Sequence, residues 1–262
     1  MSARTSAQND VEVSVSIVTP TLNAERYISE CLHSVERQSS SAIEHLVVDG
    51  GSTDTTEQIV RASGASWVSC PGLKQSAAIN VGLRLARGEV VAWLNADDLY
   101  TSGTLDYIQH RFASEPDLHA LVGDCEVVDV DGKHLWRSTP GPYDYRRLLR
   151  RGNFIAQPAV FLRKCVFDQV GYLDESLDFA MDYELWLRLR RLNVAYVPRV
   201  LAVFRWHARS KTATNLEANW RELLRIVRCH GGGWTPPLIW SYIRARLALA
   251  RQRLTTKLSD AQ

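Results

Sequence analysis

Four short apolar runs within the first hundred residues, separated by turns and helical patterns, constrain the fold of this chain more than any other feature. The runs are rich in β-branched residues, and the segments between them carry apolar residues at helical spacing. Strands that alternate with helices are typical of a parallel sheet covered on both faces. The sequence therefore predicts an α/β domain with a mostly parallel central sheet and helices on both faces. The expected strands are 15–20, 43–48, 65–70 and 90–95, and the expected helices are 24–38, 75–87 and one that begins near 53.

After Thr101 the regular alternation stops. A hairpin is expected to turn at Asp131 and Gly132, because Asp-Gly between two apolar runs is a strong turn signal. We expect a disordered lead-in over 1–12, a main domain over 13–212 and a helical extension over 213–262. The remaining expected strands are 159–163 and a pair that ends at 206, and the remaining expected helices are 143–150, 180–192, 214–230 and 238–258.

The composition is that of an ordinary globular protein, with 45% hydrophobic and 23% charged residues. No apolar run approaches the roughly 20 residues needed to span a bilayer, and the N-terminus lacks the apolar segment of a secretory signal. The five cysteines never occur at C-x-x-C spacing, which favours reduced thiols over disulfides or a zinc site. These features predict a cytoplasmic protein.

The stretch "VVAWLNADDLY" places two adjacent carboxylates, Asp97 and Asp98, at the end of an expected buried strand. Asp49 follows another strand in the same way. Ligands of open α/β sheets bind beyond the C-terminal ends of the strands, so these acids lie on the expected ligand-binding edge. A hard cation such as Mg²⁺ or Mn²⁺ takes oxygen ligands, commonly one or two carboxylates with phosphate and water. The alternative is that the pair begins a turn or caps the next helix.

Several familiar motifs are missing. The chain has no G-x-G-x-x-G, no G-x-x-x-x-G-K-[ST] and no H-E-x-x-H. Their absence argues against dinucleotide binding, P-loop phosphate binding and zinc hydrolysis.

Four segments resemble glycosyltransferase family 2 in order and spacing, over roughly Val13 to Thr212. They are "SIVTPTLNAERYISECLHSV", "HLVVDGGSTDTT", "INVGLRLARGEVVAWLNADDLY" and "MDYELWLRL". The resemblance implies an inverting glycosyltransferase with the A-type fold, which binds a nucleotide-diphosphate sugar. The donor would be UDP-, dTDP- or GDP-linked and the acceptor a sugar or a lipid-linked sugar, with a role in bacterial polysaccharide or glycolipid synthesis and no nucleic-acid partner.

The resemblance also implies roles for individual residues at the donor site. Asp97 matches the second acid of the family's D-x-D and would bind Mn²⁺ or Mg²⁺, with Asp98 beside it. Asn95 stands where the family has the first acid. Asp49 would accept a hydrogen bond from the base, with a plain turn residue as the alternative. The other residues implied to contact the nucleotide or the donor sugar are Thr19, Pro20, Asn23, Asn80 and Gln157.

Asp182 matches the family's general base, which takes the proton of the acceptor hydroxyl as it attacks the sugar. Glu184 is an alternative base, and a carboxylate early in a helix also has a structural use, since it complements the helix dipole. After a predicted strand, His207, Arg209 and Lys211 would close over the diphosphate and stabilise the leaving group, unless they form an exposed basic loop. Trp186 is expected in the core.

Two other functions remain open. The departures from the family at Ala77, Asn95 and Met181 suggest a catalytically inactive protein that binds nucleotide sugars. A nucleotidyltransferase is disfavoured, because its triphosphate needs a basic, glycine-rich loop after the first strand. The segment "TPTLNAERY" has one Arg and no Gly there.

Charge is unevenly distributed, with a net −7 over residues 1–198 and +9 over the remainder. In the last helix Ile243, Leu247, Ala250, Leu254 and Leu258 follow helical spacing, with arginines mainly off this apolar stripe and Trp234 and Trp240 before it. Such a helix lies on an anionic membrane or packs on the main domain or a second subunit. We therefore expect peripheral contact with the inner membrane face, or a dimer.

Overall fold

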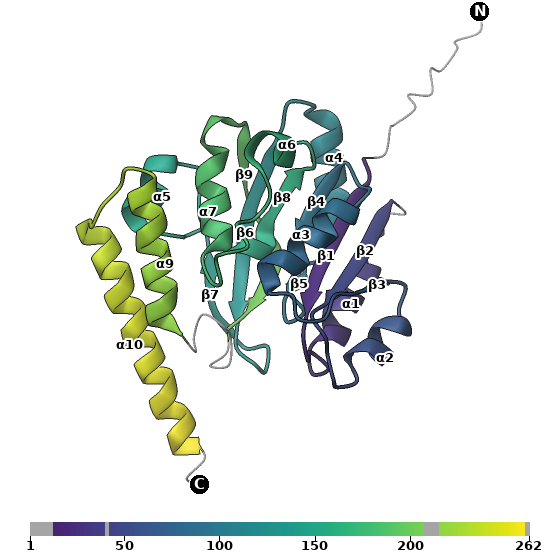
Figure 1. Ribbon diagram of the computed structural model, residues 1–262, viewed down its shortest axis with the longest axis horizontal. Helices are drawn as coiled ribbons and strands as arrows, with labels where there is room; N and C mark the ends of the chain where they lie inside the picture. Colours follow the sequence, from purple (N-terminus) through teal and green to yellow (C-terminus); the bar gives the residue numbers. More distant parts are fainter. Residues whose placement is uncertain (1–12, 40–41, 207–214, 260–262) are drawn as a thin grey trace, which may run out of the picture.

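The structure is a computed structural model that describes residues 13–39, 42–206 and 215–259, with side chains as far as 247 in the last range. The predicted lead-in over 1–12 lies outside the described residues. Within the described ranges the strands form one nine-stranded sheet of order β3-β2-β1-β4-β8-β6-β9-β5, with β7 paired to β6 (Figure 1). The strands are β1 Val15–Thr21, β2 Ile43–Asp49, β3 Ser66–Ser69, β4 Val90–Trp93, β5 Leu99–Tyr100, β6 Ala120–Val128, β7 His134–Ser138, β8 Val160–Arg163 and β9 Val194–Arg205.

The first four strands pair in parallel, as the alternating pattern predicts. The second half of the sheet is mixed. β8 runs antiparallel to both β4 and β6, whereas β6 and β9 are parallel. The helices are α1 Ile28–Glu36, α2 Thr56–Arg61, α3 Gln75–Leu85, α4 Thr104–Ser114, α5 Tyr145–Arg151, α6 Val166–Val170, α7 Met181–Arg188, α9 Leu216–Cys229 and α10 Pro236–Ser259.

Helices cover both faces of the sheet, which confirms the predicted α/β class. Because side chains alternate along a strand, neighbouring residues of β4 belong to opposite faces. Val91 and Trp93 pack in one core cluster with α3, α7 and α9. Val90 and Ala92 pack in another with α1 and α4. The central strands are therefore buried on both sides, which explains their nearly continuous apolar sequences.

The structure differs from the predicted elements in one merged strand and in several short elements that were not expected, among them the two-residue strand β5. Residues 194–205 form one strand rather than two, and its pairing with β6 is interrupted where Pro198 and Arg199 bulge between Val197 and Val200. Proline lacks the N–H that the ladder needs, so the pattern resembled a break. The helices α4 and α6 were not predicted.

The last helix leaves the body of the molecule. The first part of α10 packs on α5 and α9, with Leu238 fully buried and the Tyr242 ring 5.1 Å from that of Trp220. Its far end projects away from the rest of the chain (Figure 1). In the part of the chain that the structure describes, no helix combines the length and the apolar character needed to cross a membrane.

Candidate active site

The loops after β1 and β2 are tied to each other at the C-terminal edge of the sheet. The Asn23 side-chain oxygen accepts a hydrogen bond from Thr53 N at 2.8 Å, and Asn23 N donates to the Ser52 hydroxyl at 2.8 Å. Glu25 accepts from both the N–H and the hydroxyl of Thr55. Asn23 has φ +50, a left-handed conformation that Asn tolerates well. These reciprocal bonds fix the relative position of the two loops, and the contact of Asn23 with a nucleotide stays a prediction.

Asp49 organises the turn after β2. Its buried carboxylate accepts hydrogen bonds from the backbone N–H groups of Gly51 and Ser52, both at 2.8 Å, and from the Ser52 hydroxyl. Asp49 thus has the turn role given as the alternative, and its contact with a base stays a prediction.

Thr19 and Pro20 lie inside the molecule rather than on an open surface. The Thr19 hydroxyl is fully buried and lies 2.9 Å from His45 Nε2. Burial lowers the pKa of His45 to about 4, so its imidazole is neutral at physiological pH. Contact of Thr19 and Pro20 with a nucleotide stays a prediction. Two residues beyond Thr19, Thr21 has a buried hydroxyl for which the described residues supply no hydrogen-bond partner, and the sequence did not point to it.

Asn95 is the centre of a side-chain network at the end of β4. Its oxygen accepts from Gln75 Nε2 at 3.0 Å, while its nitrogen donates to Asp98 at 3.1 Å and to Gln157 at 3.2 Å. Gln157 in turn donates to the Trp93 carbonyl at 2.6 Å. Both ends of the amide are therefore used within the protein, so Asn95 and Gln157 hold the strand end together.

Asp98 faces inward. Its carboxylate is fully buried and accepts from the Arg205 backbone N–H at 3.1 Å as well as from Asn95. Burial, together with the neighbouring charge of Asp97, raises the pKa of Asp98 well above its usual range. Both carboxylate oxygens of Asp98 thus already accept a hydrogen bond within the protein, and its predicted role as a metal ligand stays a prediction. Asp97, by contrast, is partly exposed.

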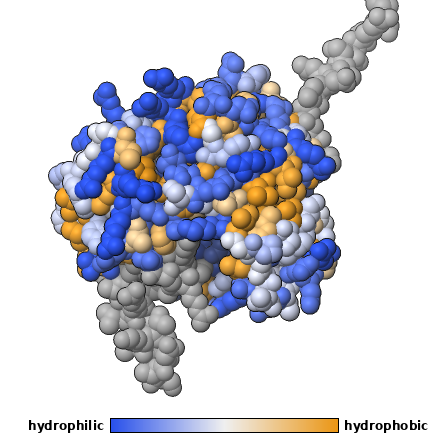
Figure 2. Space-filling model, in the orientation of Figure 1, coloured by the Kyte–Doolittle hydropathy of each residue, from blue (hydrophilic) through white to orange (hydrophobic). Residues whose placement is uncertain are grey.

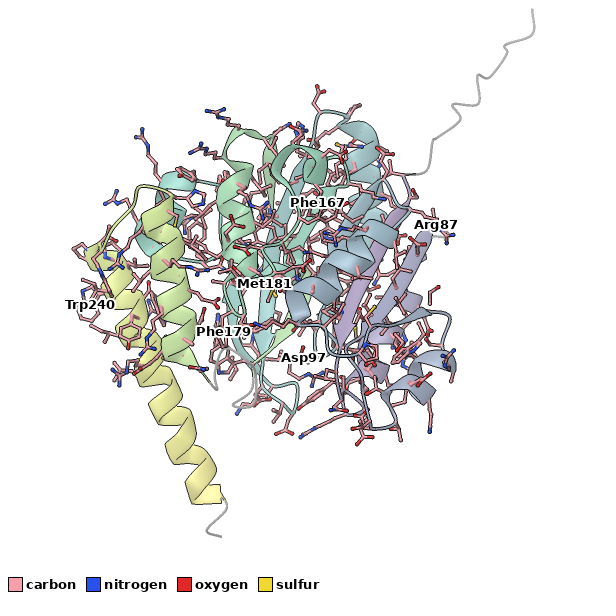
Figure 3. The ribbon with its side chains drawn as sticks, in the orientation of Figure 1. Arg87, Asp97, Phe167, Phe179, Met181 and Trp240 are labelled. Carbon is pink, nitrogen blue, oxygen red and sulfur yellow. The ribbon has the colours of Figure 1, made fainter. Side chains whose placement is uncertain are left out.

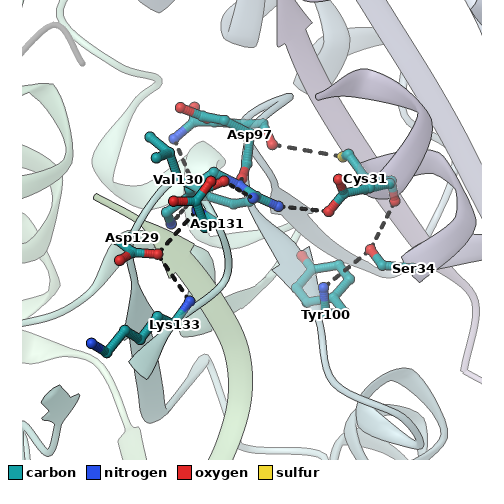
Figure 4. Close-up of polar contacts among 12 residues, drawn as sticks. Cys31, Ser34, Asp97, Tyr100, Asp129, Val130, Asp131 and Lys133 are labelled. Atoms are coloured by element: carbon teal, nitrogen blue, oxygen red, sulfur yellow. Dashed lines mark hydrogen bonds and ion pairs between the residues drawn. The ribbon is translucent and has the colours of Figure 1, made fainter. Parts of the chain in front are cut away.

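Arg205 fixes the backbone at Asp97, a role that the sequence did not reveal. Its buried guanidinium donates to the carbonyl oxygens of Asp97 at 3.2 Å and Val130 at 3.1 Å, two residues that Figure 4 labels. It also pairs with Glu30 at 2.7 Å. It also lies over the Tyr27 ring. One side chain thus connects the strand end, the β6–β7 hairpin and α1.

Asn80, which was predicted to contact the donor, joins two parts of the protein in this structure. It is buried, and its amide bonds to both the carbonyl and the N–H of Leu173, at 2.9 and 3.0 Å. This pairing pins the loop before α7 to α3. Both ends of the Asn80 amide are thus used in a backbone contact, and its contact with the donor stays a prediction.

Asp182 lies in the first turn of α7. Its carboxylate accepts from Asn153 Nδ2 at 2.7 Å and from Tyr183 N at 2.7 Å, and it remains partly exposed. Desolvation raises its pKa to about 6. Glu184, the alternative base, pairs with Arg188 at 2.7 Å. Of these two acids, Asp182 is the one suited to accept a proton near neutral pH.

The space-filling view shows a hollow in the lower centre of this face (Figure 2). Figure 3 labels Asp97 in the same part of the view and Met181, the chain neighbour of Asp182, above it. Trp186 is in the core as predicted, stacked on Trp93 with ring centroids 5.6 Å apart. The predicted phosphate contacts His207, Arg209 and Lys211 lie outside the described residues.

The donor set at this edge fits a hard cation through a single carboxylate. Among the described residues no three His, Cys, Asp or Glu side chains gather in a metal-binding arrangement. Mg²⁺, however, is often held by one or two carboxylates together with substrate phosphates and water. The partly exposed Asp97 would supply one such oxygen ligand, so the residues present are compatible with a metal that arrives with a diphosphate.

Comparisons with known sequences agree on one family. A sequence model described as glycosyl transferase family 2 matches residues 16–171. A PGL/p-HBAD biosynthesis glycosyltransferase of Mycobacterium tuberculosis is 32% identical over 200 residues, covering 72% of this chain and 73% of the relative. A Rickettsia typhi glycosyltransferase is 29% identical over 83% of this chain and 74% of its own length.

Solved structures share the fold. Residues 1–349 of Staphylococcus aureus TarS, in complex with UDP-GlcNAc, superpose with a TM-score of 0.66 at 20% identity, over 82% of this chain and 66% of that one. The chain spans only 39% of the longer TarS chain. A Pyrobaculum calidifontis mannosyltransferase in complex with GDP-Man and Mn²⁺ has a TM-score of 0.63 at 20% identity, over 91% of this chain and 70% of that one.

The Asn95 network generates a test. In Asn95→Asp the new carboxylate would face the acceptor oxygens of Asp98 and Gln157, so we expect the variant to lose about 1–3 kcal/mol of unfolding free energy. The folded state would raise the pKa of the new carboxyl, so the loss should be largest at neutral pH and shrink toward pH about 4. Denaturant unfolding at several pH values measures this, with the exposed Asn193→Asp as control. Wild-type stability of Asn95→Asp at neutral pH would contradict the network.

Proposed function

The chain belongs to glycosyl transferase family 2, and we propose that within this family it is an inverting enzyme that moves a sugar from a nucleotide-diphosphate sugar to an acceptor hydroxyl. That it is a glycosyltransferase follows from the family. Inversion, the metal and the identity of both substrates are the proposed parts.

The observation that carries the proposal is the state of Asp182. A general base must be deprotonated at working pH yet basic enough to take a proton. Desolvation raises the pKa of Asp182 to about 6, and the Asn153 amide orients the carboxylate at 2.7 Å. Partial exposure leaves the group accessible to a substrate.

In the proposed reaction Asp182 removes the acceptor hydroxyl proton while that oxygen attacks C1 of the donor sugar. The bond from C1 to the diphosphate oxygen breaks, and the nucleoside diphosphate departs with the electron pair. Attack and departure on opposite faces of C1 invert its configuration in a single displacement. The chain needs one carboxylate base for this route, and the first turn of α7 supplies it.

Asp97 would hold the metal, Mn²⁺ or Mg²⁺, on the leaving-group side. When bound, such an ion supplies charge neutralisation for the departing diphosphate. The mannosyltransferase neighbour contains Mn²⁺ with its GDP-linked donor, and TarS contains a UDP-linked one. Arg205 keeps the backbone at Asp97 in place through its bond to the Asp97 carbonyl.

The acceptor is proposed to be a glycolipid or a growing polysaccharide, since the mycobacterial relative is named for PGL/p-HBAD biosynthesis. The exposed part of α10 supports work at a membrane. Trp240 and Leu247 of α10 are 63% and 56% exposed, and Trp234, just before the helix, is 53% exposed. In Figure 3 Trp240 points away from the body. Arg244 and Arg246 are exposed on the same helix. Aromatic and basic side chains together suit an anionic membrane surface, here the inner face.

The first test concerns the base. Asp182→Asn retains size and hydrogen bonding but cannot take a proton, so kcat should fall by about 10²–10⁴-fold. In the wild type kcat/KM should drop as the pH falls below about 6, because Asp182 becomes protonated there. This acid limb should vanish from the residual activity of the variant. Glu184→Gln is the matched control and should retain activity near wild type. A wild-type kcat in Asp182→Asn would show that the base lies elsewhere.

The second test concerns α10. The double variant Trp240→Ser, Leu247→Ser changes only exposed side chains, so it should fold normally and lose sedimentation with anionic liposomes at low salt. Wild-type protein should bind these vesicles and ignore neutral ones. If the wild-type protein binds neither kind of vesicle, the membrane proposal fails. It also fails if light scattering shows that the substitutions convert a dimer to a monomer, because this face is then a subunit interface.

A further inference from the structure

The loop that enters α7 is held from one side by α9, a helix outside the stretch that matches the family. The backbone N–H groups of Asp178, Phe179 and Ala180 donate to the Glu222 carboxylate at 2.9, 2.8 and 3.1 Å. Ala180 is the residue at which α7 is capped, and Asp182 follows two positions later. The Glu222 carboxylate therefore accepts hydrogen bonds from three consecutive backbone N–H groups just before Asp182, the proposed base.

The same loop is held from the opposite side by α3. Lys74 pairs with Asp178 at 3.1 Å, and the Ser76 hydroxyl donates to the Leu177 carbonyl at 3.3 Å. Asn80 adds its two bonds to Leu173. Residues 173–180 thus form a strap between α3 and α9, and α7 begins where this strap ends.

Glu222 itself has little freedom. Its helix is packed into the main core by Leu223, Ile226 and Val227, which are all buried. The N–H groups of residues 178–180 precede the first residue of α7 and have no acceptor within the helix. A carboxylate is the strongest acceptor that a side chain can offer them. The negative charge also complements the positive end of the α7 dipole. Glu222 consequently determines where the first turn of α7 lies relative to the body.

We propose that Glu222 is a positioning residue for catalysis, which sets the location of the Asp182 carboxylate through the strap and the first turn of α7. The proposal rests on the role of Asp182 as general base. It makes the C-terminal extension part of the catalytic apparatus rather than an appendage. A displacement of about 1 Å at a reacting group can cost 10²-fold in rate, so a loosened strap should affect the chemical step. The donor edge at β1, β2 and β4 does not contact Glu222 and should keep its affinity.

The experiment compares Glu222→Gln with Glu217→Gln in the full chain. Glutamine retains one acceptor oxygen but turns an NH₂ group toward the N–H donors, so the clamp is broken with little change in volume. Glu217 is exposed on the same helix, and within the described residues it pairs with Arg221 alone, at 3.7 Å. Glu217→Gln therefore removes the same charge without changing any bond to the strap. We expect kcat of Glu222→Gln to fall about 10-fold or more, with the KM for the nucleotide sugar unchanged and Glu217→Gln equal to wild type.

Amide hydrogen exchange in the wild-type protein gives an independent measurement, which does not depend on how well the variant folds. The amides of residues 178–180 should be protected, although the loop lies outside any helix or strand. In Glu222→Gln these amides should exchange faster, while those of β1 and β4 should not change. Unprotected amides at 178–180 in the wild type would overturn the proposal, as would a folded Glu222→Gln with wild-type kcat.

Asp182→Asn, measured in parallel, separates this proposal from the one on which it rests. If Asp182→Asn is inactive and Glu222→Gln is not impaired, the base stands and the positioning role fails. If Asp182→Asn is fully active, the base assignment fails, and the positioning role fails with it whatever Glu222→Gln does.

Discussion

A fully buried carboxylate, Asp98, joins the parallel half of the sheet to its mixed half. It lies just beyond β4 and accepts a hydrogen bond from the backbone of Arg205 at the end of β9, 107 positions along the chain. Burying a charge without partners is costly, so Asn95 and Arg205 are needed beside it. The Arg205 side chain then reaches back to the Asp97 carbonyl. The exposed acid of the pair is therefore held in place by the interactions that satisfy the buried one.

The acids of this edge divide into two kinds according to their surroundings. Asp49, Asp98 and Glu222 are enclosed by N–H donors and shape the backbone around the site. Asp97 and Asp182, which are partly exposed, are the acids for which we propose contact with a metal or a substrate. Carboxylic acids can serve as structural acceptors or as reactive groups, because solvent access and hydrogen-bond partners decide whether the charged or the neutral form is stable.

Local patterns predicted much of the fold, because periodicity depends only on near neighbours. The four parallel strands, the hairpin at Asp131 and the buried Trp186 follow from such patterns. The roles of site residues were harder to predict, since a motif gives the type of a side chain but not the direction in which it points. Asn80 occupies a family position yet bonds to Leu173, 93 residues away. Arg205 and Glu222 carried no sequence signal at all, because their partners are distant in the chain and the family model ends at residue 171.

The central claim is that this edge binds a nucleotide-diphosphate sugar together with a divalent cation through Asp97. A thermal unfolding screen of UDP-, dTDP- and GDP-linked sugars, with and without Mn²⁺, tests it most directly, because a ligand of the native state raises its stability. We predict that at least one donor raises the melting temperature, more strongly with Mn²⁺, and that Asp97→Ala removes the metal-dependent part. No stabilisation by any of these donors, or an equal Mn²⁺-dependent gain in Asp97→Ala, would contradict the account.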